Sequence, residues 1–197
     1  MKTFSILVPS DIKALIFDCD GTLVDTMPIH IMAWEKAFLE LGEECPIEWL
    51  ASLKGMPEEA IVSLYNETYG KQYDPGTVVR KKHVHFRSQL HLTRPIQPVV
   101  DVALKYRGRL PLAVVSGGTR DNVLLSLEVI KIRHFFDVIL TADDDIPAKP
   151  EPDIFLEAAR RIGVNPEACQ VFEDGDIGLS AARRAGMTAT DIRPFIQ

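Results

Sequence analysis

Strand-like apolar runs alternate with helix-like segments along this chain, and that alternation limits its fold more than any other feature. Runs with the length and residue types of strands lie at 14–17, 111–115, 138–140, 169–172 and, more weakly, 187–191. Helical periodicity falls between them, over 121–131, 151–162 and 177–185. A repeated strand–helix–strand order predicts an α/β fold, with a parallel sheet covered by helices on both faces.

One long stretch interrupts the alternation. Residues 28–93 show helical periodicity and no convincing strand, with predicted helices over 31–41, 58–69 and 74–91. These about 65 residues are too many for an ordinary loop. We therefore predict a core made of residues 1–27 and 94–197, with a helical domain of residues 28–93 inserted after the first strand.

Composition narrows the class of protein. The 197 residues are 46% hydrophobic and 25% charged, with a formal net charge of -6, which is typical of a globular chain with a real core. The negative charge disfavours an extended nucleic-acid surface. No apolar run approaches the roughly 20 residues that span a bilayer, and we identify no secretory signal. Three distant cysteines favour a reducing compartment, so we expect a cytoplasmic protein, and a monomer by default.

The run at 14–17 ends directly at Asp18-Cys19-Asp20-Gly21-Thr22, which contains two carboxylates two residues apart. The carboxyl end of a parallel strand is where α/β proteins hold their ligands. Paired carboxylates there can hold a hard cation, attack an electrophile or transfer a proton. A calcium loop would need Glu at the twelfth position from Asp18, where the chain has Ile29. An ordinary turn stays possible on this motif alone.

The run at 111–115 ends at Ser116-Gly117-Gly118. A hydroxyl followed by two glycines lets backbone N–H groups approach an anion closely. The next predicted helix begins near Thr119, so its positive end points the same way. Taken alone, this motif is equally well explained as a tight turn that caps a helix.

Two further strand ends carry charge. Lys149 follows the run at 138–140 across an acidic loop, 143–145, that we expect to face solvent, and Glu173-Asp174 follows the run at 169–172. Separately, the lysine fits a solvated surface charge and the acids a polar strand end. Together with Asp18 and Ser116, they would meet at one edge of one sheet. That convergence predicts a site in which acids hold a cation and Lys149 neutralises an anion.

In this order, the four motifs resemble those of the haloacid dehalogenase (HAD) superfamily of phosphotransferases. Asp18-x-Asp20-Gly21-Thr22 is similar to the first motif, Ser116 to the second, Lys149 to the third and Glu173-Asp174 to the fourth. The surrounding phrases at 15–26, 149–155 and 171–187 resemble the β-phosphoglucomutase-like subgroup, and the likeness covers nearly the whole chain. Within that subgroup, the chain most resembles small bacterial phosphatases of phosphorylated sugars, such as fructose-1-phosphate, and of sugar acids.

The resemblance implies a Rossmann-like core with a helical cap after the first motif, and residues 28–93 fit that cap. It also implies Mg²⁺, held by Asp18, the backbone carbonyl of Asp20 and Asp174, with Glu173 assisting. Asp18 would attack phosphorus and become an aspartyl-phosphate. Asp20 would protonate the leaving alkoxide and then accept a proton from the hydrolytic water. The residues implied to bind the phosphoryl group are Ser116, Gly117 and Lys149.

The inserted helices are expected to set the substrate. His30 matches a cap histidine of the mutase, and Gly55 lies in a segment that resembles its substrate loop. Glu58 stands where the mutase has an arginine that grips a second phosphate, which an acid would repel. Arg120, near the phosphate loop, is another candidate anion contact. The basic run at 80–83 is typical of a solvated helix face, although some of its members could reach a sugar phosphate.

An acid at position 20 points to phosphate esters, because a departing halide needs no proton. We therefore predict a Mg²⁺-dependent phosphatase of small phosphorylated metabolites such as sugar phosphates, without nucleic-acid or membrane partners. Two alternatives stay open. One is a β-phosphoglucomutase, and the other is a non-catalytic anion-binding protein that kept the fold.

Overall fold

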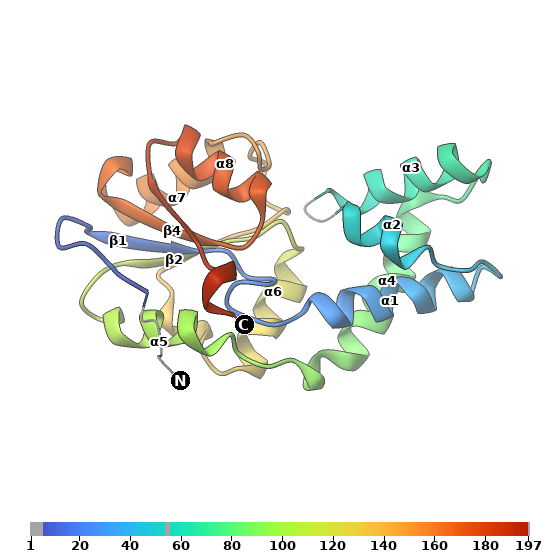
Figure 1. Ribbon diagram of the computed structural model, residues 1–197, viewed down its shortest axis with the longest axis horizontal. Helices are drawn as coiled ribbons and strands as arrows, with labels where there is room; N and C mark the ends of the chain where they lie inside the picture. Colours follow the sequence, from blue (N-terminus) through green and yellow to red (C-terminus); the bar gives the residue numbers. More distant parts are fainter. Residues whose placement is uncertain (1–5, 54–55, 197) are drawn as a thin grey trace. The chain divides into compact units, whose positions relative to one another are not determined.

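The computed structural model describes residues 6–53 and 56–196, which fall into two units (Figure 1). One unit is formed by Met1–Asp25 with Arg94–Gln197, and the other by Thr26–Thr93. The first contains the sheet, and the second contains only helices in its described part.

The sheet of the first unit is parallel and has the strand order β3-β2-β1-β4-β5. Its strands are β1 (Ala14–Phe17), β2 (Leu112–Val115), β3 (Val138–Leu140), β4 (Cys169–Glu173) and β5 (Thr188–Asp191). Every residue of β1, β2 and β4 is buried, as expected for central strands covered on both faces. The predicted α/β fold class is confirmed, and the strand ends differ from the predicted ones by at most one residue.

Helices cover both faces of this sheet (Figure 1). Alternate side chains of β1 define the two sides, because successive residues of a strand point to opposite faces. Leu15 and Phe17 join an apolar cluster with α5 (Gln97–Tyr106) and α6 (Arg120–Val129). Ala14 and Ile16 join a second cluster with α7 (Asp153–Ile162) and α8 (Asp176–Arg184).

Two helices were not expected from the sequence. The short segment before β2 was not predicted to be helical. Helix α5 nevertheless forms there, with Pro98 in its first turn and four buried apolar positions. Helix α2 (Ile47–Ser52) buries only Leu50, too little to produce a visible periodicity. Short 3₁₀ turns complete the described chain at Leu90–Leu92, Arg133–Phe135, Pro166–Ala168 and Arg193–Phe195. In the described ranges, none of the helices has both the length and the apolar character that crossing a membrane requires.

The second unit contains α1 (Met27–Leu39), α2, α3 (Glu58–Tyr69) and α4 (Pro75–Gln89). Asp74 caps α4 by accepting a hydrogen bond of 2.8 Å from the Thr77 N–H. The helix predicted over 31–41 corresponds to α1, which begins four residues earlier and ends two residues earlier. Its buried residues are Ile29, Ala33, Trp34, Ala37 and Phe38.

Candidate active site

Three central strands bring the predicted site residues to one edge of the sheet. In the register of the ladder, Phe17 of β1 pairs with Val114 of β2 and with Phe172 of β4. The residues that follow these positions therefore emerge together. Asp18 stays within the sheet's hydrogen bonding, since its N–H donates to the Phe172 carbonyl at 3.0 Å. The first motif and the fourth motif are thus neighbours across one ladder.

Lys149 joins the strand ends. Its Nζ lies 2.8 Å from Asp18 Oδ1, 2.8 Å from Glu173 Oε1 and 3.0 Å from the Val115 carbonyl oxygen. The lysine side chain is only 12% exposed, and its ammonium also lies 5.3 Å from the centre of the Phe155 ring. Burial lowers the pKa of Lys149, but the charges of Asp18 and Glu173 more than offset this and raise that pKa above its ordinary value. The two carboxylates thus favour the charged form of Lys149.

Carboxylate oxygens of Asp18, Glu173 and Asp174 all lie within 4.8 Å of one another, and all three residues are buried. Lys149 supplies one positive charge against these three carboxylates, which leaves an excess of negative charge in a place with little water. Burial raises the pKa of Asp18 well above its ordinary value; Lys149 opposes this, while Glu173 and Asp174 add to it. The donor set is all oxygen, and a divalent cation would remove the excess charge, so the residues fit such an ion.

The loop after β1 packs closely against Asp174. Thr22 Oγ1 donates a hydrogen bond of 3.0 Å to Asp174 Oδ1. Gly21 adopts a left-handed φ of 87°, and a Cβ there would lie 2.5 Å from Asp174 Oδ2. Glycine is therefore required at position 21 both by the turn and by the approach of the acid. The sequence motif contained Gly21 and Thr22, but it did not reveal that both of them orient Asp174.

Ser116 and Asp20 face each other at the end of β2. Ser116 is buried, and its Oγ lies 3.5 Å from Asp20 Oδ2. The Gly118 N–H donates to Ser116 Oγ at 3.0 Å, which fixes the hydroxyl at the start of the loop. Gly117 is exposed, and α6 begins two residues after Gly118. The Arg120 N–H at the start of α6 also donates, to Asp143 Oδ2 at 2.8 Å, so the exposed Gly117 is the position of this loop that best suits an oxyanion.

Arg120 is occupied by the loop after β3. Its guanidinium contacts Asp144 Oδ2 at 2.7 Å and the Ile139 carbonyl oxygen at 3.4 Å. The expectation that the acidic loop faces solvent is wrong for Asp144, whose side chain is 12% exposed and also accepts a hydrogen bond from the Thr141 N–H. A role for Arg120 as an anion contact stays a prediction.

The remaining predicted residues belong to the helical unit. His30 Nδ1 lies 2.7 Å from Lys82 Nζ, and the His30 ring stacks on Phe86 with 4.4 Å between ring centres. Gly55 falls outside the described residues. Lys82 belongs to the basic run that was expected to be solvated, yet it is fully buried. Lys82 is buried because it shares one face of α4 with Val78 and Phe86, at a spacing of four residues.

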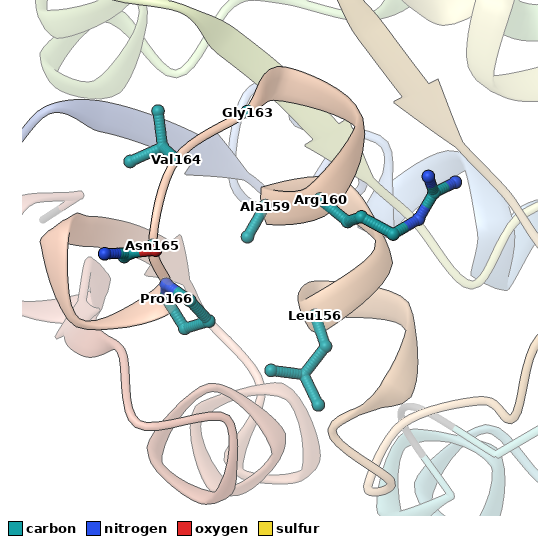
Figure 2. Close-up of a pocket in the computed structure, with 7 residues that line it drawn as sticks. All are labelled: Leu156, Ala159, Arg160, Gly163, Val164, Asn165 and Pro166. Atoms are coloured by element: carbon teal, nitrogen blue, oxygen red, sulfur yellow. The ribbon is translucent and has the colours of Figure 1, made fainter.

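A separate hollow of about 300 Å³ lies near the C-terminal end of α7 (Figure 2). Leu156 and Ala159 of the helix face Pro166 across it, and Gly163 and Asn165 complete its wall. These residues precede β4, whereas Glu173 and Asp174 stand at its far end. The hollow therefore lies at the opposite edge of the sheet from the acidic cluster and contains none of the predicted site residues.

The fold and the site together define an α/β protein whose parallel sheet carries a buried acidic cluster and a lysine at its carboxyl edge. The chain belongs to the haloacid dehalogenase-like hydrolase family, whose model matches residues 15–192. This confirms the family expected from the sequence motifs.

Similar proteins include phosphatases that act on phosphorylated sugars or carbohydrates, as their names state. The chain is 40% identical to fructose-1-phosphate phosphatase YqaB of Escherichia coli over 179 residues, which is 91% of this chain and 95% of that protein. It is 28% identical to a phosphorylated carbohydrates phosphatase of Thermotoga maritima, with 89% and 82% covered. Among solved structures, β-phosphoglucomutase from Clostridium difficile matches with a TM-score of 0.79 at 26% identity, covering 91% and 84%. The prediction of a hydrolytic enzyme of the phosphatase type is confirmed at this level.

Proposed function

We propose that the protein is a Mg²⁺-dependent phosphatase of small phosphorylated carbohydrates, acting through an aspartyl-phosphate on Asp18. The observation that carries this proposal is Lys149, which bridges Asp18 and Glu173 at the edge of a buried three-carboxylate cluster. Two relatives named as phosphatases of phosphorylated sugars or carbohydrates support the substrate class.

Mg²⁺ would be held by Asp18, Asp174 and the backbone carbonyl of Asp20, with Glu173 assisting. When bound, it supplies charge that lets a phosphate dianion approach a carboxylate. This approach requires a compensating positive charge, because two like unit charges 4 Å apart repel each other by about 4 kcal/mol at an effective dielectric constant near 20. Lys149 contributes to the same neutralisation from the protein side.

The protein's own groups divide the remaining work. Asp18 attacks phosphorus. Lys149 holds its Oδ1, which leaves the other oxygen of that carboxylate for the reaction. Ser116 and the backbone N–H of Gly117 bind oxygens of the transferred group. Asp20 donates a proton to the leaving oxygen and later takes one from the water that hydrolyses the acyl-phosphate.

We further propose that the helical unit, Thr26–Thr93, acts as a cap that encloses the substrate and excludes bulk water during the first step. His30, Gly55 and Arg120 are the candidate substrate contacts. The mutase alternative needs a second phosphate to be bound. Glu58 disfavours this, because it is an acid where the mutase has an arginine, and it occupies the neighbouring basic side chains of Lys82 and His83.

Phosphate release from a panel of sugar phosphates, with Mg²⁺ and with a chelator, tests the proposal. We expect Mg²⁺-dependent release with a preference for one or a few phosphorylated sugars. Isomerisation of β-glucose-1-phosphate in the presence of a trace of bisphosphate would favour the mutase instead. Absence of release from every substrate by folded protein would favour an anion-binding role and reject the phosphatase.

Replacing the proposed acid gives a second test. Asp20→Asn should slow hydrolysis of a sugar phosphate by about 10²- to 10⁴-fold, because an alkoxide cannot leave without a proton. With an aryl phosphate the first step should survive, since a phenolate leaves unaided, but hydrolysis of the intermediate should be slow. Stopped-flow absorbance should then record a burst of phenolate of about one per protein, followed by slow turnover. Equal loss on both substrates, without a burst, would remove Asp20 from the acid–base role.

A further inference from the structure

Glu173 occupies a slot in which α8 has no side chain. A Cβ placed on Gly178 would lie 1.8 Å from Glu173 Oε1, 2.2 Å from its Cδ and 2.9 Å from its Cγ. Real Cβ atoms do not approach other atoms so closely, and the nearby atoms belong to a side chain that is only 4% exposed. The carboxylate of Glu173 therefore lies directly against the backbone of α8, five residues further along the chain.

The carboxylate is held by hydrogen bonds inside this slot. Its Oε1 accepts from Lys149 Nζ at 2.8 Å, and its Oε2 accepts from the Gly175 N–H at 2.7 Å. A Cβ on Gly175 would lie 3.3 Å from the same Oε2, so a second glycine borders the slot. Glu173 cannot retreat from an added methyl group without leaving Lys149 or breaking its hydrogen bond to Gly175.

Conformational freedom does not explain Gly178. Gly178 is not among the described glycines that adopt a positive φ, and it is the third residue of the regular helix α8. Alanine is a better helix former than glycine at such a position. What glycine provides at position 178 is space, and Glu173 fills that space.

We propose that Gly178 is a positioning residue of the active site, which seats Glu173 so that it holds Lys149 beside the nucleophile Asp18. This inference deepens the proposed phosphatase function and rests on it. Gly178 touches neither Asp18 nor the substrate-binding loop in the contacts described above, and it acts through Glu173. A larger residue at 178 would push the Glu173 carboxylate away, and Lys149 would lose one of its two anionic partners.

A double-mutant cycle tests the slot. Gly178→Ala should lower turnover of an aryl phosphate by about a hundredfold, since a displacement of about 1 Å in a positioned group can cost that much. Glu173→Asp, whose carboxylate is withdrawn by about one carbon–carbon bond of 1.5 Å, should cost less than about tenfold, because Lys149 keeps its contact with Asp18 when the shorter acid draws back. The double variant Gly178→Ala with Glu173→Asp should be at least tenfold more active than Gly178→Ala, because the shorter acid makes room for the methyl group.

The same four proteins are compared without turnover, so that the slot is tested even if the phosphatase proposal fails. Mg²⁺ binding by calorimetry and the melting temperature in a chelator should both fall in Gly178→Ala and recover in the double variant. Gly76→Ala on α4 is the matched control, because the nearest atom to its methyl group is the flexible end of Arg80, at 3.3 Å, and the other neighbours lie at ordinary contact distances of 3.7 and 3.9 Å. If Gly178→Ala matches wild type in Mg²⁺ affinity and melting temperature, or if Glu173→Asp restores none of its losses, the positioning role is rejected.

Discussion

Asp18→Asn is expected to abolish phosphate release, with a loss of at least about 10⁴-fold, while the protein stays folded. Removal of a nucleophile costs an enzyme most of its rate, because no neighbouring group can replace the covalent step. Asn has the shape of Asp but cannot form an acyl-phosphate. Steady-state phosphate release and mass spectrometry of the trapped intermediate measure the two consequences, and both signals should disappear together.

The fold should tolerate this substitution. Asp18 is one of three clustered, buried carboxylates, of which Asp18 and Glu173 contact Lys149, so an uncharged amide removes repulsion from a cluster with excess negative charge. The Asn side chain also keeps an oxygen that can accept the hydrogen bond from Lys149. Urea unfolding in a chelator should therefore give a free energy of unfolding no lower than that of wild type.

Asp145→Asn is the matched control for this experiment. Asp145 lies exposed on the loop after β3, and its replacement removes the same charge without touching the cluster. It should retain full activity. Asp18→Asn protein that still turns over at more than about one hundredth of the wild-type rate would exclude Asp18 as the nucleophile, because losses at a true nucleophile are far larger.

The elements that the sequence predicted well are those in which local pattern and tertiary context agree. β1 and β3 have the predicted ends, because short apolar runs bounded by turn residues are what a covered parallel strand requires. Helix α3 also runs over the predicted 58–69, and it ends at Gly70, which adopts a φ of 63°. Helix α7 begins at Asp153, two residues after the predicted start, because Pro152 is its N-cap rather than a residue of its first turn.

The same logic explains how far the site could be predicted. The order of the strands places the carboxyl ends of β2, β1 and β4 side by side, so polar residues at those ends had to meet. Pattern could not reveal that Lys149 reaches two acids from a loop, or that Gly178 makes room for Glu173. These contacts join residues that are remote in sequence or lie on different elements, and residue type alone does not predict them.

Lys82 is the position at which pattern reasoning failed most clearly. A run of basic residues normally lies in solvent, but Lys82 Nζ lies 5.8 Å from the centre of the Trp34 ring and 5.0 Å from that of Phe86. Its charge is compensated by Glu58, which accepts its hydrogen bond, and His30 Nδ1 lies 2.7 Å from the same ammonium. One buried ammonium thus ties α1, α3 and α4 together.

Glu58→Ala should therefore destabilise the helical unit strongly. Removal of one partner from a buried ion pair leaves an uncompensated charge and typically costs about 3–5 kcal/mol. Glu58 also lies 2.5 Å from His83 Nε2, so the variant loses two contacts at once. Both tryptophans of the chain, Trp34 and Trp49, belong to this unit, so their fluorescence during urea unfolding reports on it alone. Glu59→Ala is the matched control, because it removes an exposed acid from the same first turn of α3.

The pH dependence of this difference identifies its cause. Burial raises the pKa of Glu58, but the hydrogen bond from His83 and the charge of Lys82 outweigh burial and lower it to about 2. A glutamate in an unfolded chain titrates with a pKa of about 4.3, the value for model peptides. Because the folded pKa is the lower one, the stabilisation is fully present above about pH 4.3 and is lost as the pH falls towards 2. The gap in unfolding free energy between wild type and Glu58→Ala should accordingly shrink as the pH falls below about 4. A gap that persists unchanged at pH 2 would show that packing, rather than the ion pair with Lys82, is what Glu58 contributes.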